Sequence, residues 1–202
     1  AFGELTYNFS DQLKLTGGLR AFNVKETFHK EADGIIAGGH SEDSGDSSES
    51  KINPKVNLSW KAAPGVLLYA QAAQGFRVGG PNTTIPPLAG YPSPSTYKSD
   101  SLWNYEVGAK TSLADGRVTF NAAAFYIDWT DIQVTVTRPD GFSFIANGDK
   151  AVSQGFEAEL SGRPAPGVEI GVSAAYTDAH LTADSKSGAG KVMWRALQER
   201  EK

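Results

Sequence analysis

Hydrophobic and polar residues alternate along most of the chain. In residues 55–61, the polar Lys, Asn and Ser side chains fall on one side, while Val56, Leu58 and Trp60 fall on the other. Successive side chains of a β-strand point to opposite faces, so this pattern predicts a strand with one apolar face. The same alternation recurs in residues 13–20, 104–110, 156–161 and 168–177. The predicted fold is all-β and antiparallel.

Short and long connections alternate between the predicted strands. Turn signals such as Asp115-Gly116 are typical of tight hairpins, and similar short connections occur at residues 10–11, 63–65 and 163–167. Longer connections are expected at residues 26–50, 79–97 and 137–141, and another begins near Ala183. About eight strands joined in this way are typical of an outer-membrane barrel, with short periplasmic turns and longer extracellular loops.

The predicted strands are long. Residues 65–78, 104–113, 117–137 and 167–182 match or exceed the ~9–11 residues that a tilted strand needs to cross a bilayer. Strands of soluble sandwiches are usually nearer ~5–6 residues. A Lys or Arg side chain facing lipid at mid-bilayer costs ~2–4 kcal/mol, so the charged face is expected to line the lumen. This lumen-lining set is Glu106, Lys110, Glu157 and Glu159.

Composition argues against several other functions. The net charge of −4 gives no basic field for nucleic acid, and the absence of Cys excludes thiol chemistry. Neither a Gly-x-Ser-x-Gly elbow nor a phosphate-binding P-loop is present. Glu157 and Glu159 are spaced as a carboxylate pair, but their alternation with apolar neighbours is explained by lumen lining. We therefore expect no enzyme and no catalytic residues.

Several segments resemble one protein family in their amino-acid sequence and in their order along the chain. They are residues 15–20, 68–82, 103–110, 121–133, and 147–148 followed by 155–160, and they resemble the barrel of TonB-dependent receptors. The resemblance covers about residues 1–182, which we expect to form part of that barrel. Residues 183–202 are expected to be a loop or a non-native, disordered tail.

The resemblance implies a many-stranded, plugged barrel in the outer membrane of a Gram-negative bacterium. Such a receptor imports a scarce nutrient, most often a ferric siderophore, with energy delivered through TonB. The implied partners are TonB, acting through an N-terminal plug, the siderophore or a similar bulky nutrient, and outer-membrane lipid. No cofactor is expected, and iron is expected only as part of a bound siderophore complex.

The sequence also predicts that this piece is incomplete. Residues 1–9 have the pattern of a strand already in progress, and neither a plug nor closing strands are recognisable. About eight strands of a wider barrel leave two unpaired edges, so we expect an open curved sheet that does not transport by itself.

Ligand-binding candidates lie at the expected extracellular end. Arg77, Asn82 and Arg138 are suited to an anionic ligand, and Tyr91, Tyr97, Trp103 and Trp129 offer flat apolar contact. Loop structure and an aromatic girdle are the competing interpretation of these residues. Replacing Arg77 by alanine is expected to weaken ligand binding and leave barrel assembly normal.

No metal site is expected. The acidic, serine-rich residues 41–50 lack the ligand spacing of a calcium loop, and His29, His40 and His180 fall in or beside expected loops, none at helical metal-ligand spacing. Two alternative functions stay open: a soluble, secreted β-sandwich or β-solenoid acting as a binding or adhesin domain, and a passive porin.

Overall fold

The chain consists of twelve strands in the part that the computed structural model describes, which is residues 1–34, 39–86, 88, 91 and 93–182. The expected tail, residues 183–202, lies outside the described residues. The strands are β1 (Phe2–Asn8), β2 (Leu13–Ala32), β3 (Ser41–Ala63), β4 (Val66–Arg77), β5 (Gly80–Pro81), β6 (Thr96–Tyr97), β7 (Asp100–Leu113), β8 (Val118–Thr130), β9 (Gln133–Thr137), β10 (Ser143–Asn147), β11 (Lys150–Ala165) and β12 (Val168–Leu181). Among the described residues, no helix has the length and apolar character to span a membrane.

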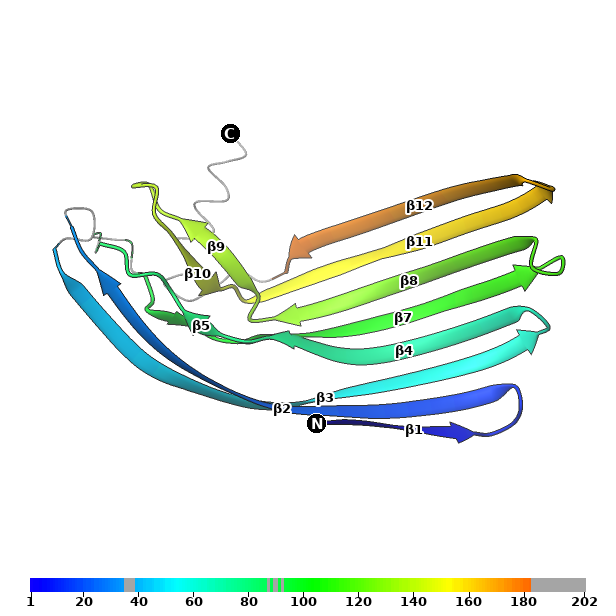
Figure 1. The fold of residues 1–202 in the computed structure, drawn as a ribbon, viewed down its shortest axis with the longest axis horizontal. Helices are drawn as coiled ribbons and strands as arrows, with labels where there is room; N and C mark the ends of the chain where they lie inside the picture. Colours follow the sequence, from blue (N-terminus) through cyan, green and yellow to red (C-terminus); the bar gives the residue numbers. More distant parts are fainter. Residues whose placement is uncertain (35–38, 87, 89–90, 92, 183–202) are drawn as a thin grey trace.

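Eight of these strands form one antiparallel sheet in the order β1-β2-β3-β4-β7-β8-β11-β12. The sheet is curved, and β1 and β12 lie at its opposite edges, where they do not pair with each other (Figure 1). The expected open sheet of about eight strands is confirmed. Tight turns join the strands at one end, whereas β5, β9, β10 and the tips of β2 and β3 lie at the other (Figure 1). We call the second end the outer end.

The register places polar residues opposite polar residues and apolar residues opposite apolar residues on neighbouring strands. Lys110 lies opposite Asn121, which in turn lies opposite Glu159, so polar side chains continue from β7 to β11 on one face. Ala109, Ala122 and Ala158 form the neighbouring row on the other face. We call the polar side the inner face and the apolar side the outer face. The outer face carries exposed apolar side chains, among them Val56, Leu58, Val107, Phe120, Phe156, Ile170 and Val172.

The exposed surface is too large for a compact soluble domain. The chain exposes 13553 Å², whereas a soluble monomer of its mass exposes about 9,200 Å². On β2 the outer face is apolar or glycine from Leu13 to Ala21, and on the paired β3 it is apolar from Trp60 to Ile52. Asn23 and Ser50 then begin a polar stretch. This apolar band matches the ~9–11 residues of a tilted membrane strand.

The expected long loop over residues 26–50 was wrong for most of its length. The structure continues β2 to Ala32 and begins β3 at Ser41, with uninterrupted pairing between them. Main-chain hydrogen bonds hold such a ladder whatever the side chains are, so polar composition did not exclude strands. On the inner side, the Lys30 Nζ donates to the Asn82 carbonyl oxygen at 2.5 Å, which supports the protruding hairpin.

The expected single strand over residues 117–137 was also wrong. β8 ends at Thr130, Asp131 has a positive φ of 54°, and β9 pairs with β10 in a separate two-stranded sheet. This hairpin brings together Val136, Phe144 and Ala146, which form a buried apolar cluster. The buried cluster therefore lies at the outer end and not within the eight-stranded sheet.

Gly65 lies in the tight turn between β3 and β4, and Gly167 lies in the tight turn between β11 and β12. Both have a positive φ, 74° and 78°, which disfavours any residue with a Cβ. A Cβ at Gly65 would also overlap the carbonyl oxygen of Ser112, whereas a Cβ at Gly167 would meet no atom within 4 Å. We predict that Gly167→Ala lowers the free energy of unfolding by about 1 kcal/mol and that Gly65→Ala lowers it by clearly more.

The measurement is urea unfolding of the full-length protein, monitored by its electrophoretic mobility with and without heating. Because the two glycines share the same backbone conformation, the difference between the variants isolates the overlap with Ser112. Equal losses in the two variants would contradict this register between β4 and β7.

Candidate functional site

A buried carboxylate organises the outer end of the sheet. Asp100 is 1% exposed and accepts hydrogen bonds from the Arg77 backbone N–H at 2.9 Å and from the Arg77 Nε at 2.8 Å. The Arg77 Nη2 is also bonded to it, and the backbone N–H of Gln133 donates at 3.2 Å. A buried charge is tolerated only when it is paired and hydrogen-bonded, and here β4 and β9 provide the partners of a carboxylate on β7.

Two side-chain amides attach the β9–β10 hairpin to the neighbouring connection. The Gln133 Nε2 donates to the carbonyl oxygens of Val78 and Lys98, at 2.9 and 3.0 Å. The Asn147 Oδ1 accepts from the Lys98 N–H at 2.7 Å, and its Nδ2 donates to the carbonyl oxygens of Lys98 and Asp131. These amides pair with main-chain groups that no strand partner satisfies.

Asn82 makes a second attachment of the same kind. The residue is 5% exposed, and its Oδ1 accepts a hydrogen bond from the Ile145 N–H at 2.7 Å. Its Nδ2 donates to the carbonyl oxygens of Pro94 and Ile145, at 3.0 and 2.7 Å. The hydrogen bonds of Asn82 thus connect the β5–β6 segment to β10.

Arg77 lies on the inner face at the outer end. Besides its bonds to Asp100, its guanidinium lies 4.8 Å from the ring centroid of Trp129, and 48% of its side chain is exposed. Replacing Arg77 by alanine would remove partners of a buried carboxylate as well as any ligand contact. The expectation that barrel assembly stays normal in that variant does not fit this geometry, and the ligand-contact role stays a prediction.

The other ligand-binding candidates are dispersed. Arg138 is 2% exposed at the tip of the β9–β10 hairpin, where its guanidinium donates to the Asp140 carboxylate and lowers the pKa of that group. Tyr91 lies in the connection before β6, and its backbone N–H donates to the Leu88 carbonyl oxygen. Trp103 is on the outer face, where it stacks with Tyr105 at 6.0 Å, so the structure does not bring it to the other candidates.

Tyr97 lines a groove at the outer end. The groove has a volume of about 480 Å³ and lies between the outer half of β3 and the β5–β6 segment, with Phe28, Glu49 and Lys98 also in its wall. Burial raises the pKa of the Glu49 carboxyl, but hydrogen bonds from Ser99, Lys51 and Gly79 outweigh it and leave the pKa below its usual value. Glu49 is therefore a carboxylate at neutral pH.

The predicted lumen residues Glu106 and Lys110 both lie on the inner face of β7. The Tyr69 hydroxyl donates to the Glu106 Oε1 at 2.5 Å, and the Lys110 Nζ lies 5.7 Å from the centroid of the same ring. The Tyr69 ring covers Gly108, where an added Cβ would meet ring atoms at 2.7 Å. A side chain at Gly108 would displace this ring, so glycine permits the contact.

Glu157 and Glu159 lie on the same inner face of β11. Together with Tyr69, Lys110 and Ser173 they line a shallow hollow of about 270 Å³. All four predicted lumen residues therefore share one face, although their role as the lining of a closed lumen stays a prediction.

Sequence reasoning missed the residues that hold the outer end together. Asp100 and Asn147 lie outside the predicted strands, where polar residues are usually solvated, and Gln133 falls inside the strand predicted over residues 117–137. Only the register shows that Asp100 lies opposite Arg77 and that Gln133 lies opposite Asn147. No spacing in the sequence distinguishes them from neighbouring loop residues.

The chain matches a known family along nearly all of its length. The sequence profile described as TonB dependent receptor-like, beta-barrel, matches residues 1–193, which extends past the expected domain boundary at residue 182. The chain belongs to the TonB-dependent receptor β-barrel family. This family comprises receptors and transporters of the Gram-negative outer membrane, so the chain is an outer-membrane β-barrel protein and its family is not one of enzymes.

The similar proteins are much longer than this chain. The metal-pseudopaline receptor CntO of Pseudomonas aeruginosa is 27% identical over 149 residues, which is 74% of this chain and 20% of the relative. The ferric yersiniabactin uptake receptor FyuA of Yersinia pestis gives a TM-score of 0.76 at 24% identity, over 92% of this chain and 27% of that one. The copper transporter OprC gives 0.69 at 17% identity, over 89% and 29%. The structural likenesses show the same barrel fold.

We predict that Asp100→Asn in the full-length TonB-dependent receptor loosens the outer end and leaves the barrel folded. Hydrogen bonds to a charged group contribute about 1.5–3 kcal/mol, so hydrogen exchange at the Gln133 amide is expected to accelerate by about tenfold or more. The measurement is hydrogen exchange with mass spectrometry in detergent. Asp11→Asn, in an exposed turn at the opposite end, is the control. Unchanged exchange at Gln133 in Asp100→Asn would show that Asp100 does not hold β9.

Proposed function

We propose that this chain forms part of the wall and the ligand-selecting extracellular connections of a receptor that imports a metal–siderophore complex, most often a ferric one. The observation that carries the proposal is the family match over residues 1–193. It is supported by the connections at the outer end of the sheet. There, Arg77 and Val78 at the end of β4 are hydrogen-bonded to Gln133 of the β9–β10 hairpin. Because the chain spans about a fifth of the curated relative, transport is a property of the whole protein.

The inner face is suited to enclose a plug domain. Glu106, Lys110, Glu157 and Glu159 offer charged partners to a polar surface inside the barrel. TonB would act through that plug.

The outer end is suited to select a ligand by shape and by polar contact. Lys30, Lys51, Arg77 and Arg138 are each paired with a nearby carboxylate. The groove beside Tyr97 offers an aromatic surface next to Glu49 and Lys98. Arg77, with its half-exposed guanidinium, is the cation best placed to meet an anionic siderophore from the inner face.

The names of the relatives support a metal-containing cargo. They are a metal-pseudopaline receptor, a ferric yersiniabactin uptake receptor and a copper transporter. A passive porin is the second candidate for the whole protein, because a wide barrel without a plug conducts by diffusion. The requirement for TonB separates the two.

We predict that a strain lacking the full-length receptor loses uptake of one class of ⁵⁵Fe-labelled siderophore, when catecholate, hydroxamate and carboxylate types are compared. Restoring the receptor gene restores uptake, and a strain without TonB shows none even when the receptor is present. Uptake that persists without TonB would favour the porin, and unchanged uptake of every siderophore without the receptor would contradict an iron cargo.

Tyr97→Ala in the same receptor tests the ligand-selecting role of the groove. The expected result is about tenfold weaker binding of the transported siderophore, from the loss of one aromatic contact. Tyr126→Ala removes an aromatic ring from the outer face and is the matched control, with unchanged binding expected. Equal affinities of both variants and the unaltered receptor would remove the groove from the ligand site.

A further inference from the structure

The protruding β2–β3 hairpin carries metal-ligating side chains on one face. Glu31 lies opposite Glu42 and His29 lies opposite Ser44 in the ladder. Beyond them, the Gly39 N–H donates to the Gly34 carbonyl oxygen at 3.0 Å, which places Asp33 opposite His40. These positions alternate with Lys30 and Asp43, which face the inner side. His29, Glu31, Asp33, His40 and Glu42 therefore project from the outer face of the hairpin.

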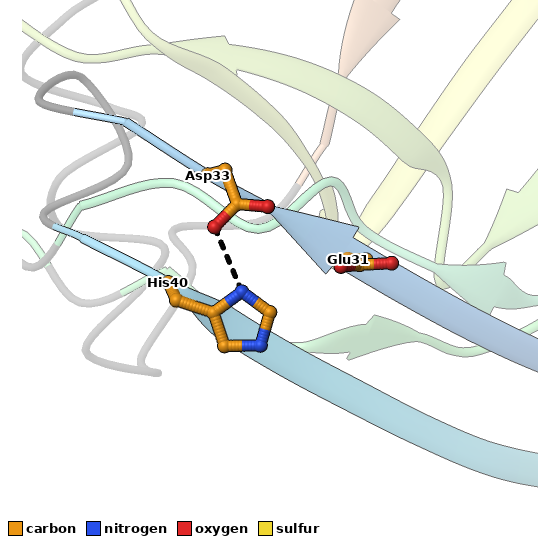
Figure 2. Close-up of side chains that lie close together, drawn as sticks. All are labelled: Glu31, Asp33 and His40. Atoms are coloured by element: carbon orange, nitrogen blue, oxygen red, sulfur yellow. Dashed lines mark hydrogen bonds and ion pairs between the residues drawn. The ribbon is translucent and has the colours of Figure 1, made fainter.

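Three of these side chains converge near the tip. One ligand atom from each of Glu31, Asp33 and His40 lies within 4.8 Å of the other two, and all three residues are exposed. The Asp33 carboxylate faces the imidazole of His40, with an Oδ1–Nδ1 distance of 2.8 Å, and Glu31 projects from the end of β2, two residues before Asp33 (Figure 2). Ligands of a tetrahedral ion are about 3.4 Å apart, so small rotations of exposed side chains suffice to close the set.

We propose that Glu31, Asp33 and His40 form a site for a zinc ion on the outer face of the hairpin. Imidazole nitrogen combined with carboxylate oxygen is the donor set of zinc and related first-row ions, whereas calcium and magnesium take oxygen ligands alone. When the ion binds the His40 Nδ1, it takes the place of the hydrogen bond to Asp33, and the neutral ring carries its proton on Nε2.

The surroundings favour a cation at this position. Beyond the apolar band, the outer face of the hairpin carries the carboxylates of Glu31, Asp33, Glu42 and Asp46, against the single ammonium of Lys25. The His29 Nε2 lies 3.7 Å from the Glu42 Oε1 in the adjacent rows, which places two further ligands beside the first three. Three protein ligands leave a coordination position for water.

This site is separate from the proposed cargo pathway. It lies on the outer side of the hairpin, whereas Lys30 and Phe28 on its inner side contact the connection and groove at the outer end. Helical metal-ligand spacing does not reveal the set, because Asp33 directly follows β2 and His40 directly precedes β3. The site ties the two strands together across the turn, so bound zinc is expected to slow hydrogen exchange at the Gly39 amide.

The test uses the full-length, tag-free receptor in detergent, stripped of metal and free of siderophore. Zinc chloride is titrated by calorimetry, and cobalt chloride is titrated as a spectroscopic substitute with absorption between about 500 and 700 nm. We expect one zinc equivalent to be bound, and about tenfold or more weaker binding in His40→Ala and in Asp33→Asn. The cobalt absorption is expected to fall in both variants.

His180→Ala is the matched control. The His180 Nδ1 lies 3.5 Å from the Asp178 Oδ1 on the outer face of β12, and its side chain is 50% exposed, against 58% for His40. Within the described residues, this His–Asp pair is not part of a three-ligand group. Its loss should leave zinc binding unchanged. Equal stoichiometry and affinity in the unaltered receptor and His40→Ala would overturn the proposal, as would an equal loss in His180→Ala.

Discussion

Main-chain hydrogen bonding in lipid is the constraint on which this structure depends. Hydrocarbon offers no partner for an N–H or a C=O group, so every membrane-spanning strand must pair on both sides. The ladders from β1 to β12 satisfy six interior strands, and β1 and β12 each keep one unpaired edge. In a barrel of ~22 strands, these edges are where the neighbouring wall continues. The open sheet is thus one arc of a closed structure.

The same constraint explains which features the sequence predicted. Once strands pair in lipid, a charge such as Lys110 must avoid the hydrocarbon, and alternation with Val107 and Ala109 follows. Residues 55–61 and 104–110 therefore revealed their strands and faces. The ladder itself does not depend on side chains, so the mostly polar hairpin from Asn23 to Ala32 and from Ser41 to Ser50, with Val24 and Phe28 as its large apolar residues, gave only a weak apolar signal. Its extension beyond the apolar band was not predictable from alternation.

The outer end follows different physics, and the sequence predicted it poorly. Asp131, with its positive φ, ends β8, and the β9–β10 hairpin that follows depends on side chains for its attachment to the neighbouring connections. The Asp100 carboxylate and the amides of Asn82, Gln133 and Asn147 bond to main-chain groups that have no strand neighbour. Such long-range pairings come from the register and not from local pattern. Arg77 and Asn82 were predicted as ligand contacts, and the structure adds that they support the outer connections.

Electron paramagnetic resonance of spin labels in the full-length receptor, in liposomes, tests the central claim that the sheet is membrane wall with its polar face inward. Labels at positions 107 and 109 are predicted to collide with oxygen, which concentrates in lipid, and not with a water-soluble nickel complex. Labels at positions 106 and 110 are predicted to show low oxygen collision. Equal oxygen collision at all four positions would contradict the membrane assignment.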